Sequence, residues 1–168
     1  MALPLKANEV DSTAPFTPEE LLYRRVERSE LNSRGEVDPT RINAVSFRKD
    51  VESAPSVMRS KFSSPQDVLD VLCAERDVNG WLVFSIRVDE LPTGLTTGDG
   101  RSFDFFPKHV PLENCGAHSV TASALSSDPS RTYAKPNPKV TGAFKARFAT
   151  ALKQVPLTGK ENGAPAEG

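Results

Sequence analysis

Trp81-Leu-Val-Phe-Ser-Ile-Arg-Val88 is the stretch that decides the fold. It is rich in β-branched and aromatic residues, and turn-forming residues flank it on both sides, which is typical of a β-strand. One face of this strand is wholly apolar, whereas the other carries Ser85 and Arg87 beside Trp81. We expect the apolar face to pack on the core, and we expect Arg87 to need water or a partner.

The composition is that of an ordinary soluble domain. The chain has 168 residues, of which 38% are hydrophobic and 26% charged, and its formal net charge is -1. This length is sufficient for a sizeable core, and the balanced charge gives no general attraction to nucleic acid or to an acidic membrane. No apolar stretch approaches the ~20 residues of a membrane span, and the first residues lack the apolar segment of a signal peptide. We therefore expect a cytoplasmic protein.

Further strand patterns surround the central one. Leu22-Tyr-Arg-Arg-Val26 alternates in the manner of a strand and predicts the first one. Because side chains alternate between faces, Leu22 and Arg24 should lie on one side, and Tyr23 and Arg25 on the other. Weaker strand patterns occupy residues 44–48, 56–62 and 115–122.

Three start signals predict helices. Thr17-Pro18-Glu19-Glu20 is a capping box with proline at the first helical position, which indicates a helix of one or two turns. Ser64, followed by Pro65 and Asp67, is the expected N-cap of a second helix. Asn137-Pro138 starts a third helix. Apolar residues recur along one face of that helix, namely Val140, Phe144, Phe148 and Leu152.

These patterns together predict one α+β domain over residues 16–153. Its sheet should be mixed or mostly antiparallel, with two main helices packed on it. Each helix pattern has a single apolar stripe, so we expect both helices on the apolar face of the Trp81 strand. Residues 1–15 and 154–168 lack periodicity and are predicted to be disordered tails.

The predicted ligand-binding residues are the arginines of the first strand and their neighbours. Lys and Arg outnumber Asp and Glu between residues 23 and 62. Arginine suits a planar grip on phosphate or carboxylate, and the alternative interpretation is a solvated face with ion pairs. The predicted set is Tyr23, Arg24, Arg25, Arg87 and His118, with Arg87 expected beside the first strand.

The sequence shows no recognisable catalytic or metal-binding constellation. Its two histidines are His109 and His118, and Cys115 lies three residues before His118. In a strand, such residues point to opposite faces, so this pair can meet only in a turn or a helix. Cys73 and Cys115 do not form a disulfide framework, and with two distant histidines they lack the spacing of a zinc site. We expect two reduced thiols, no metal and no cofactor.

The order of motifs resembles that of small uncharacterised bacterial proteins. The motifs are Leu22-Tyr-Arg-Arg-Val26, Phe47-Arg48 and the helix start Ser64-Pro65, and the resemblance covers residues 20–122. It implies no established activity.

A first-strand arginine, a Ser-Pro helix start and a following strand also resemble the layout of RES and related ADP-ribosyltransferase-like toxins. This second resemblance implies NAD binding through Arg24 or Arg25, helped by later aromatic, serine and glutamate residues. Neither Asp70 nor Glu75 stands where that family has its acidic residue on or near the helix.

We therefore predict a small bacterial binding or interaction module of an accessory or defence-type system. Its expected partner is another protein, with no nucleic acid and no membrane. The first alternative is an NAD-using ADP-ribosyltransferase-like enzyme or toxin, a degenerate one included, with NAD as cofactor. The second alternative is an immunity-type inhibitor protein.

Overall fold

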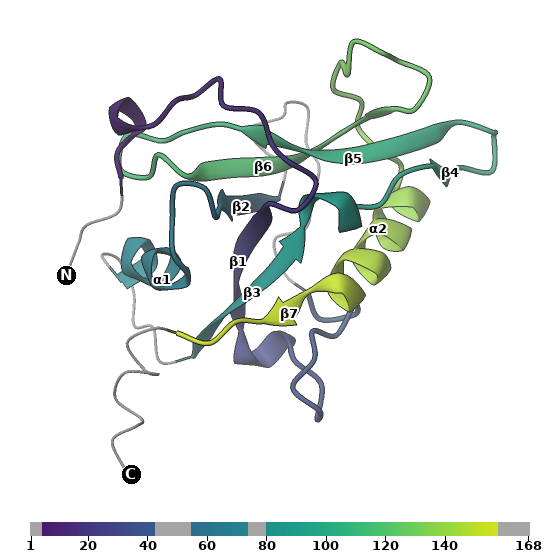
Figure 1. The fold of residues 1–168 in the computed structure, drawn as a ribbon. Helices are drawn as coiled ribbons and strands as arrows, with labels where there is room; N and C mark the ends of the chain where they lie inside the picture. The colour runs from purple at the N-terminus through teal and green to yellow at the C-terminus, as the bar shows by residue number, and fades with distance from the viewer. Residues whose placement is uncertain (1–4, 43–54, 74–79, 158–168) are drawn as a thin grey trace.

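The chain folds around a curled, seven-stranded β-sheet (Figure 1). A computed structural model describes residues 5–42, 55–73 and 80–157. The strand order is β4-β5-β6-β2-β1-β3-β7, and all pairings between these strands are antiparallel. The predicted α+β class is confirmed in its broad form, although the sheet dominates and the helices are few.

The two edge strands, β4 and β7, are the shortest, and β5 and β6 are the longest. They are β1 (Leu21–Glu27), β2 (Ser56–Arg59), β3 (Trp81–Arg87), β4 (Leu95–Thr96), β5 (Ser102–His109), β6 (His118–Leu125) and β7 (Lys153–Gln154). The helices are α1 (Pro65–Cys73) and α2 (Pro138–Ala151), with 3-10 turns η1 (Ala7–Glu9), η2 (Arg28–Glu30) and η4 (Val88–Glu90). The strand pattern at residues 44–48 lies outside the described residues.

Strand β3 pairs with β1 along its whole length and confirms the strand predicted from Trp81. The alternation predicted for β1 is also confirmed, because Leu22 and Val26 belong to one buried cluster and Tyr23 to another. Strand β5, which contains Pro107, is not among the strands predicted from the sequence. The amide of Phe105 points away from β6 and donates to the Pro92 carbonyl. Pro107 lies two residues later, so the N–H that it lacks would also point away from β6. The hydrogen bonds between β5 and β6 are therefore all kept.

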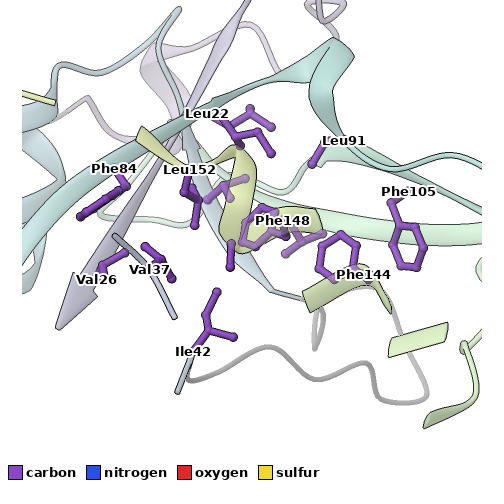
Figure 2. Close-up of a cluster of buried hydrophobic side chains, with 14 of the residues drawn as sticks. Leu22, Val26, Val37, Ile42, Phe84, Leu91, Phe105, Phe144, Phe148 and Leu152 are labelled. Atoms are coloured by element: carbon purple, nitrogen blue, oxygen red, sulfur yellow. The ribbon is translucent and has the colours of Figure 1, made fainter. Parts of the chain in front are cut away.

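The two main helices lie on opposite faces of the sheet, which corrects the prediction of one shared face. Helix α2 packs its phenylalanines against the larger cluster, where the ring centroids of Phe105 and Phe144 are 4.4 Å apart (Figure 2). Helix α1 packs Val68 and Leu69 on the other face, with Val83 of β3. The mixed face of β3 is therefore also buried, because Trp81 and Val83 give it enough apolar surface to hold a helix.

Both longer helices begin where the sequence predicts. Ser64 and Asp67 form the expected capping box, with each side chain accepting from the backbone N–H of the other. The side chain of Asn137 accepts from the amide of Val140 at the start of α2. The short helix predicted at Thr17–Glu20 is wrong. These residues form only a turn, because the Glu20 carboxylate pairs with Arg59 instead of capping.

Arg59, the last residue of β2, is fully buried and joins several distant segments. Its guanidinium contacts both carboxylate oxygens of Glu20, each at 2.8 Å, and it also donates to the carbonyls of Ala14 and Pro15. The Phe16 ring lies against the guanidinium, with the Arg59 Cζ 3.8 Å from the ring centroid. The charge is thus both paired and hydrogen-bonded, as a buried charge requires.

The described parts of both predicted tails pack on the domain. The amide of Gly116 donates to the Leu5 carbonyl, and a Cβ at position 116 would lie 2.5 Å from the Lys6 oxygen. Glycine is therefore required where the N-terminal segment crosses this turn. At the other end, β7 pairs with β3, and the amide of Val155 donates to Val83. Backbone hydrogen bonds thus continue on both sides of the predicted domain of residues 16–153.

We predict that Glu20→Ala lowers the free energy of unfolding by about 3–5 kcal/mol, because it leaves Arg59 charged and buried without its carboxylate. The neighbouring exposed residue supplies the control, since Glu19→Ala should change stability by less than about 0.5 kcal/mol. Urea unfolding at neutral pH measures both variants. Equal stability of the two would contradict a structural role for the Arg59–Glu20 pair.

Candidate functional site

A cavity of about 280 Å³ opens beside the N-terminal end of β2. It lies between β1, β2, helix α1 and the turn that precedes β6. Four of the five predicted ligand-binding residues line it: Tyr23, Arg24, Arg25 and His118. The other lining residues are Ser56, Val57, Met58, Val68, Leu112 and Cys115. The tertiary structure thus brings together residues that are almost a hundred positions apart in the sequence.

His118 is held by hydrogen bonds to both ring nitrogens. Nδ1 lies 2.7 Å from the Val110 carbonyl oxygen, and Nε2 lies 3.2 Å from the Ser56 hydroxyl. Because a carbonyl can only accept, Nδ1 carries the hydrogen in the neutral ring, and Nε2 accepts from Ser56. The Val110 amide also donates to the His118 carbonyl, so the backbone beside the ring is fixed as well.

The surroundings of His118 favour the neutral imidazole. Burial is the main cause that lowers its pKa, and the positive charge of Arg25 lowers it further. The hydrogen bond to Val110 acts in the opposite direction. His118 is therefore a neutral hydrogen-bond acceptor at neutral pH.

The two neighbouring arginines differ sharply in exposure. Arg24 is buried on the α2 side of the sheet, where it donates to the Ser56 carbonyl and lies over the Phe148 ring. Burial lowers the pKa of Arg24 to about 10, so it stays charged at neutral pH. Arg25 is exposed on the α1 side, and its guanidinium lies over the Trp81 ring at 5.9 Å from the centroid. Arg25 therefore supplies the positive charge that faces the cavity side of the sheet.

Tyr23 and Cys115 give the cavity weakly polar walls. Burial raises the pKa of the Tyr23 hydroxyl and of the Cys115 thiol, so both remain protonated at neutral pH. A protonated thiol is a poor nucleophile, so the Cys115 thiol has low reactivity. Cys115 and His118 lie at the two ends of a turn, in which the His118 amide donates to the Cys115 carbonyl. The strand predicted from residue 115 accordingly begins only at His118.

Arg87 lies away from the cavity. The register of the β1–β3 pair places it opposite Leu21, whereas Arg25 lies opposite Val83. Its guanidinium binds both carboxylate oxygens of Asp89, at 2.9 and 2.7 Å, on the protein surface. Arg87 thus lies beside the first strand, as expected, but it is not among the residues that line the cavity. Its side chain pairs instead with a carboxylate two residues away.

Ser56, which forms a hydrogen bond with His118, is not among the site residues predicted from the sequence. Its only local signal is a weak strand pattern. Its position depends on the pairing of β2 with β6, in which Met58 lies opposite His118. Leu112 was missed for a similar reason, because it reaches the cavity through a turn closed by its two backbone hydrogen bonds to Cys115.

Among the described residues, no group of three or more His, Cys, Asp or Glu side chains is placed to hold a metal ion. Within the same residues, no helix has the length and apolar character needed to span a membrane. Comparison with protein-family models, with curated proteins and with solved structures finds no match to this chain.

We predict that His118 contributes to the pH dependence of stability. The pKa of His118 in the folded protein lies below the unfolded value of 6.5. As the pH falls, His118 therefore becomes protonated at a higher pH in the unfolded chain than in the folded protein. Stability is therefore full above about pH 6.5 and decreases as the pH falls toward the folded pKa. Urea unfolding near pH 7.5 and pH 5.5 should show a smaller loss in His118→Gln than in the wild type. An equal loss in the two proteins would contradict the lowered pKa.

Proposed function

We propose that this protein is a binding module whose cavity holds an apolar side chain next to an anionic group. The last residue of a partner polypeptide presents this combination. The observation that supports the proposal is the mixed lining of the cavity. It has apolar walls, two arginines and a neutral histidine, and no carboxylate among its described lining residues.

The apolar part of the lining suits a single aliphatic or aromatic side chain. Val57, Met58 and Val68 are buried in the walls. Leu112 is 48% exposed, and in the described part of the chain it is one of two large hydrophobic residues that are exposed. It places apolar surface where a partner can cover it. Burial of one such side chain contributes on the order of 1.5–3 kcal/mol.

The polar part of the lining suits the end of a peptide. Arg25 supplies a positive charge at the cavity, which attracts the carboxylate at the end of a peptide. Ser56 gives its hydrogen to His118, and its oxygen keeps lone pairs that accept from a peptide N–H. Terminal carboxylate capture is an established mode of peptide recognition.

The geometry supports the NAD-using alternative less well. A cavity of about 280 Å³ lies just below the usual range of volumes for ligand sites, whereas a dinucleotide needs a large site. Arg24, one of the two arginines implied by the toxin resemblance, also lies buried against Phe148. The bacterial accessory or defence-type setting remains part of the proposal and rests on sequence resemblance alone. In the immunity-type alternative, the partner polypeptide would be a toxin.

We expect the protein to bind N-acetyl-leucine with a dissociation constant on the order of a few millimolar. This value follows because about twelve non-hydrogen atoms each contribute ~0.3 kcal/mol to the binding free energy. N-acetyl-leucinamide, which lacks the charge, should bind at least ~10-fold more weakly, because a charge-assisted hydrogen bond contributes about 1.5–3 kcal/mol. Isothermal titration calorimetry measures both affinities. Arg25→Gln should remove the preference for the acid, whereas Arg34→Gln, an exposed arginine outside the cavity, should retain it.

Two results would contradict the proposal. The first is equal affinity for the acid and the amide in the wild-type protein. The second is thermal stabilisation by NAD that Arg24→Ala or Arg25→Ala abolishes, since this would favour the NAD-using enzyme.

A further inference from the structure

Ser56 and His118 have the arrangement of a nucleophile and its base. The Ser56 Oγ lies 3.2 Å from His118 Nε2, and the opposite ring nitrogen, Nδ1, lies 2.7 Å from the Val110 oxygen. A serine hydroxyl becomes nucleophilic when a base within hydrogen-bond reach accepts its proton and a third group orients that base. The Val110 carbonyl performs the orienting role, because it selects the tautomer that leaves Nε2 unprotonated.

This arrangement is fixed by the backbone. Ser56 begins β2 and His118 begins β6, and the antiparallel register that sets Met58 opposite His118 places Ser56 two residues away. The amide of Val110 donates to the His118 carbonyl, so residues 110 and 118 are joined by the backbone as well as by the ring. Ser56 is itself exposed, so a substrate can reach its hydroxyl from the cavity.

We propose that Ser56 is a nucleophile that accepts a small apolar acyl group, with His118 as its general base. The proposal goes beyond binding and rests on the proposed function in one respect, namely that the substrate occupies the same cavity. The apolar lining residues Met58, Val68 and Leu112 would hold the acyl chain.

The reaction is acyl transfer from an ester. The Ser56 oxygen bonds to the ester carbonyl carbon while its proton moves to His118 Nε2. The bond from that carbon to the leaving oxygen then breaks, and the alcohol departs with the proton from Nε2. Water hydrolyses the acyl-serine in the same way, with His118 again taking and returning a proton, and releases the carboxylic acid.

Arg25 has two opposing effects on this chemistry. Its positive charge would stabilise the oxyanion that forms at the carbonyl oxygen. The same charge disfavours the imidazolium that His118 becomes when it takes the serine proton. We therefore expect slow turnover, with the acyl-serine as the most readily detected product.

The test uses the full-length protein with p-nitrophenyl butyrate. We expect nitrophenolate release and the addition of one butyryl group, mapped to Ser56 by peptide mass spectrometry. Ser56→Ala should abolish this label, and His118→Gln should slow acylation by roughly 10²-fold. Ser127→Ala, which removes another exposed serine outside the cavity, should react like the wild type.

A butyryl group found only on lysines, or a Ser56 label that forms at the same rate in His118→Gln, would overturn the proposal. Calorimetry with N-acetyl-leucine on the same samples separates the two proposals. Binding of this ligand without acylation of Ser56 would reject the nucleophile and leave the binding module intact. Loss of both would reject the two together.

Discussion

The buried charge of Arg59 is the constraint on which the rest of the structure depends. An unpaired guanidinium in this position would be very costly, so the chain must bring a carboxylate and several carbonyls to it. Glu20 and the carbonyls of Ala14 and Pro15 meet this need, and they fix the N-terminal segment over the end of β2. The Arg59–Glu20 pair holds the N-terminal segment in one position, because breaking this buried pair costs more free energy than losing an ordinary surface contact.

The same interaction extends toward the cavity. The Arg59 Nη1 lies 3.4 Å from His109 Nδ1, and His109 Nε2 lies 2.8 Å from the Gly116 carbonyl oxygen. Gly116 belongs to the turn that leads into His118, and the N-terminal segment packs directly on it. The charge buried at the end of β2 thus supports the turn that sets His118 beside Ser56. The binding and acyl-transfer proposals both depend on this support, since each needs a fixed imidazole.

Sequence patterns correctly predicted the elements that are fixed by interactions between neighbouring residues. Helix α1 has its capping box and α2 has its N-cap and its apolar stripe in consecutive residues, so neither start requires knowledge of the fold. The predicted helix at Thr17–Glu20 failed because the carboxylate that should cap it has a stronger partner 39 residues away. Likewise, the sequence could suggest Arg25 and His118 as site residues, but their convergence on one cavity with Ser56 depends on two long-range strand pairings.

The sequence by itself determined the strands β1 and β3, the starts of both helices and the faces along which side chains alternate. These follow from periodicity and capping, which act over a few neighbouring residues. Only the tertiary structure decided that the helices cover opposite faces, that Arg87 pairs with Asp89 on the surface and that Ser56 meets His118. The physical reason is that strand order and the pairing of buried charges depend on residues far apart in the chain, for which no local pattern exists.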